Sequence, residues 1–600
     1  MTDTPTRPPL DHPAPTFART TWSSLDGRWH FDQGTAGDSP SDWVWDSRIE
    51  VPFPPESAAS GLGLARCDHP RYHRTFSVMR AEGQRVLLHC EGIDHHARVW
   101  VDDHLVGEHT GGYTPFVLDI TEALADDEVH DLVIAATDLA RDLEQPRGKQ
   151  DWHDDPHMIW YDRSSGIWRS VWLEVVPAVR LASVAWTTRD TIGHLDGTVT
   201  ITGWDETDPL TVEATFACEG VDLGTVRAEA TASVVELGTR LGRAAGADTP
   251  WLYWTPESPL LIDVRLRLLR GEVVLDEVAS YTGLRTIAVR DGVVELNGQA
   301  MFSRLVLEQA FWPESHFTAP SADAVRAEAA LVKELGFNGL RMHQVSADPR
   351  FLRACDEMGL MVWADVPAAY VPTVRSTALH THTLSELIAR DRNHPCVVAW
   401  VPYNESWGVP EVADDARQQA AVRAAYWLAK ALDPTRLVIG NDGWENVVGD
   451  LVGVHDYTHD PAVLTARYGT PDAVATTIAT ARPGARVLLA APHSAGTPVL
   501  LSEFGGVSLA RGDQSWGYGG VADADALVDQ VRALAAAVGE ASGVVGFCWT
   551  QLTDCRQEQN GLAWPDRTPK APVRALAAAL HGRSPRPVDG LTDPGTEELA

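Results

Sequence analysis

The second half of the chain alternates short apolar runs with amphipathic helical patterns, and this alternation constrains the fold more than any other feature. The stretch 321–335 illustrates a helix, because it carries an apolar stripe, begins at Ser321 and ends before Gly336. Repeated units of strand and helix close most simply into a (β/α)8 TIM barrel. We predict the barrel over residues 288–600, with strands near 301–307, 338–341, 360–366, 397–402, 436–440, 451–455, 498–503 and 544–550.

Two of the predicted strands end in a glutamate. The run 397–401 is followed by Asn404 and Glu405, and a later run ends at Glu503. Residues just past the carboxyl end of a barrel strand face the reaction cavity. One such glutamate is more often an ordinary loop residue, but two in one barrel are what glycoside hydrolysis requires: one carboxylic acid to protonate the leaving oxygen and one carboxylate to attack or to activate water.

The first half of the chain predicts two all-β domains. Residues 17–178 contain short alternating strands separated by Gly, Asp and Pro turns, including a hairpin turn at Asp102-Asp103, and these features indicate a β-sandwich. Residues 179–287 form a second all-β block, and its length fits one immunoglobulin-like β-sandwich. The Pro-rich, polar residues 1–16 are expected to form a flexible arm.

The composition restricts the possible binding partners and the cellular compartment of the protein. A net charge of −34 disfavours nucleic acid and anionic membranes as partners. The N-terminus lacks the apolar core of a signal peptide, and no run is long enough for a membrane helix. The 7 cysteines are scattered without a CxxC motif, which favours reduced thiols and a cytoplasmic protein. The 22 tryptophans suit a carbohydrate ligand. We predict no cofactor, and a homo-oligomer is left open.

The sequence motifs at the strand ends resemble those of glycoside hydrolase family 2, the group of β-galactosidases, β-glucuronidases and β-mannosidases. The matching motifs are Asn404-Glu405 after a Trp-containing strand and Ser-Glu-Phe-Gly at 502–505. Residues 22–31 and 159–172 resemble the opening and closing segments of that family's sugar-binding jelly-roll β-sandwich, and 281–287 resembles the entry into its barrel. The resemblance spans residues 17 to 575.

This resemblance implies roles for five residues. Glu405 would be the general acid/base, and Glu503 would be the nucleophile of a retaining double displacement. Asn404 would donate a hydrogen bond to the sugar 2-hydroxyl, Arg341 would hold the nucleophile ionised, and Tyr457 would donate a hydrogen bond to it. For each of the last three, a purely structural role remains the alternative.

Other polar and aromatic residues near strand ends are weaker candidates. His343 follows Arg341 by two positions, whereas the histidine comes one residue later in many members of the family. Trp549 is expected to form a floor on which the sugar stacks, and Gln309 and Trp312 to reach the cavity mouth. We predict no metal site, because residues 455–459 match no tight zinc spacing. The remaining candidates for substrate contact are His455, Asp456, Trp407, Asp365, Trp444 and, from the first domain, Asp162 and Trp160.

The sequence restricts the sugar only partly. β-Glucuronidases of this family carry an Asn-x-Lys triplet after the eighth strand, whereas this chain reads Glu558-Gln559-Asn560 there. The resemblance therefore implies an exo-acting glycosidase of an oligosaccharide or small glycoside, most simply β-galactosidase-like on a neutral sugar. An arabinosidase, a β-mannosidase or β-glucosidase, and a non-catalytic carbohydrate-binding protein are the alternatives. A further alternative is a lyase or a metal-dependent hydrolase with the same barrel fold.

Overall fold

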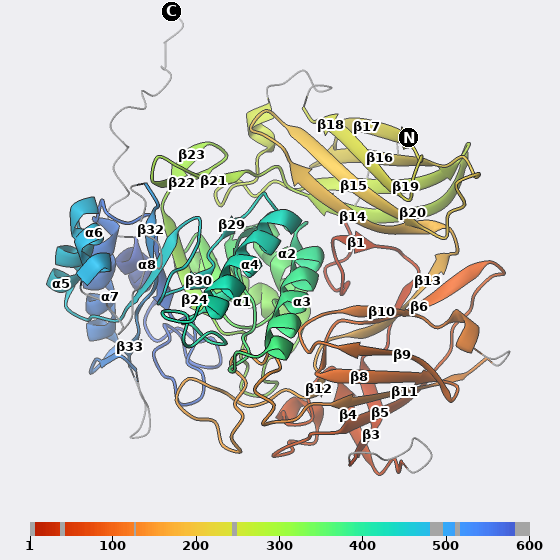
Figure 1. Cartoon of the computed structure of the whole chain (residues 1–600), viewed down its shortest axis with the longest axis horizontal. Helices are drawn as coiled ribbons and strands as arrows, with labels where there is room; N and C mark the ends of the chain where they lie inside the picture. The colour runs from red at the N-terminus through yellow and green to blue at the C-terminus, as the bar shows by residue number, and fades with distance from the viewer. Residues whose placement is uncertain are drawn as a thin grey trace, which may run out of the picture.

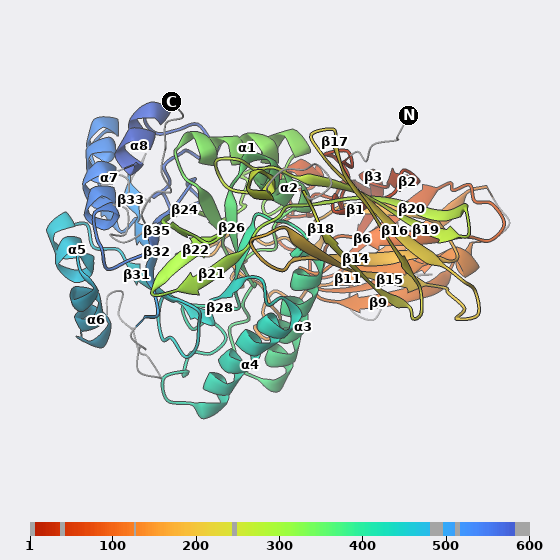
Figure 2. The same cartoon turned by 90° about the horizontal axis from the view of Figure 1, so that it is seen from above.

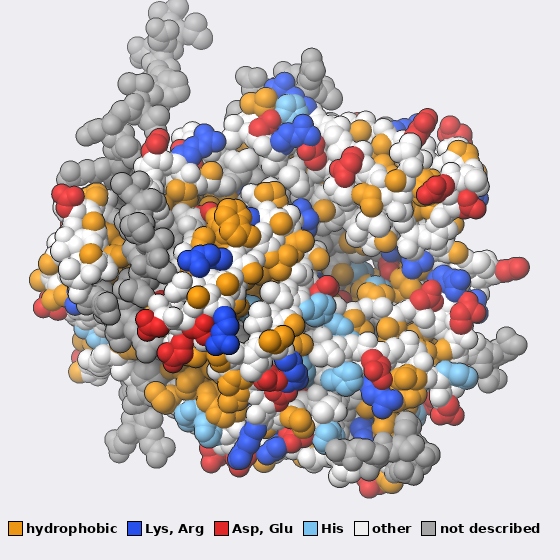
Figure 3. All heavy atoms as spheres, in the orientation of Figure 1, with side chains coloured by type: hydrophobic (Ala, Val, Ile, Leu, Met, Phe, Trp, Pro, Cys, Tyr) orange, Lys and Arg blue, Asp and Glu red, His pale blue; other side chains and the backbone are white. Residues whose placement is uncertain are grey.

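The computed structural model describes residues 7–35, 43–124, 128–242, 249–480, 496–509 and 517–581. Two β-sandwiches lie side by side at one end of the molecule, and a barrel of strands wrapped by helices forms the other end (Figures 1 and 2). On the face shown in Figure 3, acidic and basic side chains are interspersed. Within the described residues, no helix is both long and apolar enough to span a membrane.

The first sandwich packs a sheet of four strands against a sheet of six around a continuous apolar core. Its predicted hairpin turn is confirmed, since Asp102 and Asp103 have φ of 46° and 65°, the left-handed values that a tight two-residue turn needs. The four-stranded sheet has the order β10 (Phe116–Asp119), β6 (Gln84–Cys90), β13 (Val171–Pro177) and β2 (Trp22–Ser24). The six-stranded sheet has the order β4 (Ser47–Val51), β3 (Gly27–Gln33), β5 (Pro70–Phe76), β11 (His130–Thr137), β8 (His96–Val101) and β9 (His104–Thr110). Two short strands, β7 (Ile93–Asp94) and β12 (Gly166–Ile167), pair beside them.

The second sandwich packs sheets of five and three strands around its own core. The larger sheet has the order β1 (Phe17–Ala18), β20 (Val273–Thr282), β19 (Ile262–Arg270), β16 (Thr211–Cys218) and β17 (Val221–Glu229). The smaller has the order β14 (Arg180–Thr188), β15 (His194–Thr202) and β18 (Val234–Arg240). Strand β1 therefore belongs to the second sandwich, although it precedes all strands of the first sandwich in the sequence.

The eight predicted barrel strands are present in one sheet, and all of its strand pairs are parallel. A three-stranded antiparallel sheet precedes it, made of β21 (Ile287–Arg290), β22 (Val293–Leu296) and β23 (Gln299–Met301). The barrel order is β29 (Leu437–Val438), β27 (Val397–Val401), β26 (Met361–Asp365), β25 (Gly339–Met342), β24 (Ser303–Glu308), β35 (Gly546–Thr550), β32 (Val499–Gly505) and β31 (Val452–Asp456).

The helices cover the outside of the barrel and mostly begin at capping residues. The predicted helix at 321–335 is confirmed as α1 (Ala322–Glu334), capped by the Ser321 side chain. The others are α2 (Pro349–Met358), α3 (Val374–Asp391), α4 (Ala416–Leu432), α5 (Pro461–Tyr468), α6 (Pro471–Thr480), α7 (Ala524–Gly539) and α8 (Val573–Leu580). Between β29 and β31 the described chain forms turns and the short strand β30 (Asn441–Asp442) in place of a helix.

The expectation of a flexible arm is wrong for the part of it that the structure describes. Residues 1–6 lie outside the described residues, but His12 is fully buried. Its ring packs edge-on against Trp22 and Trp172, with centroids 4.7 and 5.3 Å away. Burial of aromatic surface fixes this segment against the first sandwich, an effect that its polar, Pro-rich composition conceals.

A buried carboxylate joins the second sandwich to the barrel. Asp356, on α2, accepts hydrogen bonds from the Tyr281 hydroxyl of β20 (2.8 Å), from His394 Nδ1 (2.6 Å) and from the Cys396 backbone N–H (2.8 Å). A charged acceptor that is buried must keep its donors, because each lost donor leaves desolvated charge without compensation.

Removal of the Tyr281 hydroxyl tests this joint. Tyr281→Phe should lower the free energy of unfolding by about 1.5–3 kcal/mol, the range for hydrogen bonds to charged groups. Tyr253→Phe is the matched control, because its hydroxyl meets neutral backbone groups, the Asp190 carbonyl at 3.5 Å and the backbone of Gly193, and it should change stability less. Thermal and chemical unfolding of the three proteins would measure this, and equal stability of wild type and Tyr281→Phe would refute the role.

Candidate active site

The two strand-end glutamates meet at the carboxyl end of the barrel. An oxygen of Glu405, an oxygen of Glu503 and a ring nitrogen of His455 all lie within 4.8 Å of one another. Glu503 lies within β32, and Glu405 follows β28 (Tyr403–Asn404), the short extension of β27. The barrel thus brings together two carboxylates from separate strands at a separation close to the roughly 5–5.5 Å of retaining glycosidases.

The backbone at Glu405 has an uncommon conformation that aims its side chain into the cavity. Glu405 and Ser406 have φ of 49° and 58°, values that few residues other than glycine adopt. Strand β30 holds this turn: the Asp442 carbonyl accepts from the Glu405 N–H (2.9 Å), and the Asn441 side chain accepts from the Ser406 N–H (3.0 Å). The neighbouring strand therefore sustains the strain.

Arg341, at the end of β25, is completely buried beneath the two glutamates. It donates to both oxygens of Asp365 (3.0 and 2.9 Å) and to Asp442 Oδ2 (2.6 Å). It also donates to Asn404 Oδ1 (2.8 Å) and to Glu503 Oε1 (3.2 Å). A buried guanidinium of fixed geometry thus sets the positions of four side chains at once.

His455, at the end of β31, bridges the two glutamates. Its Nδ1 lies 2.7 Å from Glu405 Oε1 and 3.4 Å from Glu503 Oε2, and its Nε2 lies 3.0 Å from Asp442 Oδ2. Burial would lower the pKa of His455, but the surrounding carboxylates, with Glu503 foremost, outweigh burial and raise it to about 10. The imidazolium therefore donates from both of its nitrogens at neutral pH.

The two glutamates have different electrostatic surroundings. Burial raises the pKa of Glu503 to about 7, with the charge of Glu405 adding to the effect, while His455, Arg341 and Tyr457 oppose it. Burial acts on Glu405 in the same direction, but the hydrogen bond and charge of His455 outweigh it and lower its pKa. Between these two ionisations the pair holds one proton.

Two further predicted residues point at the same place. The Tyr457 hydroxyl donates to Glu503 Oε2 at 2.5 Å, and Thr550 Oγ1 lies 3.3 Å from that hydroxyl. Asn404 uses its oxygen to accept from Arg341, while its buried Nδ2 has no hydrogen-bond partner within the described part of the chain. A buried donor without an acceptor is a position for a ligand oxygen.

The remaining candidates on the barrel divide into two groups. Asp365 and His343 join the cluster, because Asp365 also accepts from His343 Nδ1 (2.8 Å). Burial lowers the pKa of His343 to about 4, so this imidazole is neutral. Asp456, in contrast, points toward α5, where it accepts from Tyr468 (2.9 Å) and Arg467 (2.8 Å).

Trp549 has no exposed surface, although a stacking floor was expected there. Its ring packs edge-on against Phe504 at 5.2 Å, and a Cβ on Gly505 would lie 2.9 Å from it. The ring therefore fills the barrel interior and offers no face to a ligand in this structure. Trp444 is half-buried and lies two positions beyond Asp442 in the loop after β30.

The first sandwich reaches the site through the loop of residues 147–162. Lys149 is buried there, with its Nζ 3.7 Å from Glu558 Oε2 and 5.9 Å from the ring centre of Trp407. The Tyr161 hydroxyl donates to the same Glu558 oxygen at 2.6 Å. Lys149 was not among the sequence candidates, because nothing local to it signals a contact with a distant loop.

Trp160 and Asp162, predicted to reach across to the sugar, instead bind the barrel. Asp162 forms a bidentate ion pair with Arg556. The Trp160 indole N–H donates to the Tyr370 hydroxyl at 2.6 Å, and its ring lies 6.2 Å from that of Trp407. Asp162 thus joins the two domains, whereas Trp160 and Trp407 remain at the border of the cavity.

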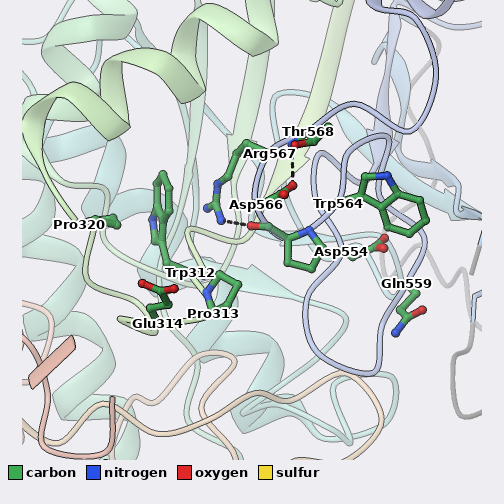
Figure 4. A pocket seen from close by; sticks show the side chains of 11 residues that line it. Trp312, Pro313, Glu314, Pro320, Asp554, Gln559, Trp564, Asp566, Arg567 and Thr568 are labelled. Carbon is green, nitrogen blue, oxygen red and sulfur yellow. Dashed lines mark hydrogen bonds between the residues drawn. The ribbon is translucent and has the colours of Figure 1, made fainter. Parts of the chain in front are cut away.

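A separate cavity of about 700 Å³ lies between the loops that follow β24 and β35 (Figure 4). Trp312 and Arg567 line it, with the guanidinium 3.3 Å from the centre of the indole ring. Gln309, the other residue expected at the mouth, is buried and donates to Gln551 at 2.6 Å. Among the described residues that line this cavity, neither catalytic candidate occurs.

Among the residues that the structure describes, three clusters have the residue types of a metal site, with ligand atoms within 4.8 Å of one another: Asp151, His153 and His157; Asp356, His394 and Cys396; and Glu405, His455 and Glu503. Direct hydrogen bonds of 2.6–2.9 Å already join Asp151 to both of its histidines. The side chains of residues 455–459 do not converge, because His459 binds the Gly505 carbonyl and Asp456 faces α5.

Asp442 is the main barrel residue that sequence reasoning missed. Burial would raise its pKa, but Arg341 and His455 outweigh burial and lower it to about 2. Its Oδ1 requires a glycine opposite, because a Cβ on Gly453 would lie 1.6 Å from it. The signal was present, since Asn441-Asp442 follows the fifth strand as Asn404-Glu405 follows the fourth.

Curated relatives match part of this chain. A β-galactosidase of Thermoanaerobacter pseudethanolicus is 30% identical over 343 residues, covering 56% of this chain and 44% of the relative. A β-glucuronidase of Rattus norvegicus is 26% identical over 413 residues, covering 63% of this chain and 61% of the relative. The chain therefore spans less than two thirds of either relative.

Solved structures share the whole architecture. The β-glucuronidase of Bifidobacterium dentium, complexed with coumarin-3-O-glucuronide, has a TM-score of 0.75 at 20% identity, covering 94% of this chain and 98% of its own. A β-galacturonidase from Eisenbergiella tayi has a TM-score of 0.71 at 19% identity, covering 96% of this chain and 99% of its own. At these identities the likeness establishes the fold.

Two family models match different domains of the chain. The glycosyl hydrolases family 2 TIM barrel domain matches residues 287–506, and the glycosyl hydrolase 2 galactose-binding domain-like model matches residues 62–169. Both models describe the same family, and they match in the order in which the structure places the first sandwich and the barrel. The chain belongs to glycosyl hydrolase family 2.

Proposed function

We propose that this protein is a retaining exo-glycosidase that hydrolyses terminal glycosides through Glu405 and Glu503. The observation that carries the proposal is the approach of the two carboxylates to within 4.8 Å across one site. Exo action would require the site to be closed on one side, and the first sandwich supports this, because Tyr161 and Asp162 bind Glu558 and Arg556 in the loop after β35.

The proposed reaction has two steps. The one proton that the pair holds favours Glu503 in the protein without substrate, so it must pass to Glu405 when the sugar binds. In the first step, the charged Glu503 then attacks the anomeric carbon and forms an ester, while the bond to the leaving oxygen breaks and Glu405 gives that oxygen its proton. In the second, Glu405 takes a proton from water, the water oxygen bonds to the anomeric carbon, and the ester bond breaks. Arg341 and Tyr457 support the nucleophile role of Glu503, because both donate to its charged form.

We propose a neutral sugar, β-galactosidase-like, as the substrate. Glu558 lies next to Lys149 at 3.7 Å, so the buried ammonium from the first sandwich already has a carboxylate partner. A uronic acid would bring a second negative charge against Glu558, whereas hydroxyl groups can bind to both members of the pair. The curated relatives include β-galactosidases and a β-glucuronidase, so the substrate panel must contain both sugar types.

We also propose a cytoplasmic location. All seven cysteines are buried and free, which suits a reducing compartment. Recovery of the native protein with a disulfide bond would contradict this location.

The carboxylate roles are tested by single substitutions. Glu405→Ala and Glu503→Ala should each lower kcat/KM on unactivated glycosides by roughly 10²–10⁴-fold, the range for loss of acid–base catalysis, or more for Glu503. Only Glu405→Ala should regain much of its rate on aryl glycosides with good leaving groups, because these need no proton. The panel should include galactosides, glucosides, mannosides and arabinopyranosides. Equal losses for both variants on every leaving group would contradict the assignment.

The pH profile tests the shared proton. Activity requires one proton on the glutamate pair, so kcat/KM should fall as pH rises through about 7, the pKa of Glu503. It should also fall at low pH, below the ordinary glutamate pKa of 4.5, as the pair takes up its second proton and no carboxylate remains to attack. Tyr457→Phe removes a donor to the Glu503 carboxylate, which raises the pKa of that group. The upper limb of this variant should therefore move to higher pH while kcat drops. If the upper apparent pKa of the profile were the same in Tyr457→Phe and in wild type, the proposed hydrogen bond to Glu503 would be refuted.

The sugar preference is tested at Glu558. Wild type should favour an aryl β-galactoside over the matching β-galacturonide. Glu558→Gln should narrow that ratio by roughly tenfold to a hundredfold, because it removes one negative charge and leaves the Lys149 ammonium, 3.7 Å from Glu558, without its carboxylate partner. Glu229→Gln, at an exposed position of β17 in the second sandwich, is a control that should leave the ratio unchanged. A wild-type preference for the uronide would overturn the proposal of a neutral sugar.

A further inference from the structure

Aromatic rings from two domains form a continuous surface at the border of the site, which we call the aromatic wall. Its members are Trp152, His157 and Trp160 from the first sandwich and Tyr370 and Trp407 from the barrel. The ring centres of Trp407 and Tyr370 lie 5.6 Å apart, and those of Trp152 and Trp160 lie 4.9 Å apart. His157 stacks on Trp160 at 4.8 Å. All five side chains are half-buried, so they keep ring surface open to solvent.

Three polar atoms of the wall are already engaged. The Trp160 N–H donates to the Tyr370 hydroxyl at 2.6 Å, and that hydroxyl donates to the Gly148 carbonyl at 2.6 Å. The His157 Nδ1 lies 2.6 Å from Asp151. Since these groups bind one another, the wall presents mainly apolar ring surface to whatever lies beside it.

The wall begins on the side of the site where the leaving group must lie. Trp407 comes two residues after Glu405, and its ring centre lies 6.1 Å from that of His343. The general acid stands beside the glycosidic oxygen, so the group attached to that oxygen extends past Glu405. On the opposite side, Glu503 is enclosed by Arg341, His455 and Tyr457.

We infer that the aromatic wall is a leaving-group subsite that selects a planar aromatic aglycone. This inference rests on the proposed glycosidase function and deepens it. A flat ring can lie against Trp160 and Trp407 and bury apolar surface on both, which lowers the barrier when the sugar is held for attack. A second sugar can also stack on indole rings, but it offers a smaller apolar face than a planar aromatic ring, and its hydroxyl groups meet a surface where three polar atoms already bind one another or the backbone.

Two leaving groups of similar acidity and different shape test the inference. For the sugar that the substrate panel identifies, wild type should have a higher kcat/KM on the phenyl glycoside than on the hexafluoroisopropyl glycoside, which has no ring. Trp160→Ala should lower kcat/KM on the phenyl glycoside about three- to tenfold, as expected for loss of one aromatic contact. It should leave the hexafluoroisopropyl glycoside unchanged. Trp160→Phe, which keeps a ring, should retain most of the preference.

Controls separate this inference from the proposed function. Trp427 is 63% exposed on α4, away from the site, and Trp427→Ala should behave as wild type on both substrates. The glycosyl fluoride of the same sugar has no aglycone, so wild type and Trp160→Ala should hydrolyse it equally. Thermal unfolding would confirm that Trp160→Ala is folded.

The outcomes are distinct. Equal losses on both glycosides and on the fluoride would show that Trp160 acts on the sugar or the fold, and would overturn the leaving-group inference while the glycosidase proposal stands. A loss confined to disaccharide substrates would identify a second sugar as the occupant and overturn the aromatic one. No turnover of the fluoride by wild type would overturn the proposed function and the subsite with it.

Discussion

The site depends on one buried cation. Arg341 lies at the centre of the barrel without exposure to solvent, and its donors reach Asp365, Asp442 and Glu503. Burial of an unpaired guanidinium would be strongly unfavourable, so the carboxylates and the cation stabilise one another in place. Because each of these acids comes from a different strand, the ion cluster also fixes the relative register of the strands at their carboxyl ends.

His455 extends this cluster to the cavity. Its protonated ring links Asp442, which belongs to the buried cluster, to Glu405, which faces the substrate. The left-handed turn at Glu405 is held by the same short strand that carries Asp442. The position of Glu405, the proposed general acid, is thus set by hydrogen bonds to His455 and to strand β30, which is the support that an active site needs to keep its geometry.

Much of the barrel could be predicted from sequence because its signals are local. Apolar runs of strand length, capping residues such as Ser321 and polar residues at strand ends are each visible in a short window, and they located the eight strands, Glu405 and Glu503. The roles of Arg341 and Tyr457 came from the family resemblance, and the structure places both within hydrogen-bond distance of Glu503.

The errors concern contacts between segments far apart in the chain. Asp456 and His455 are adjacent in sequence, yet the alternation of a strand directs one to α5 and the other to the cavity. Trp549 has the residue type of a stacking platform but fills the barrel interior. Lys149 reaches Glu558 only because the two domains pack together, and no local sequence pattern in either segment predicts that contact.

The anomeric configuration of the first product tests the central claim most directly. Proton NMR during early turnover, before the free sugar equilibrates, would show which anomer forms. Two carboxylates whose oxygens lie within 4.8 Å leave no room for a water molecule behind the sugar, so the account predicts a product with the configuration of the substrate. A product of opposite configuration would mean that Glu503 activates water, and would contradict the mechanism.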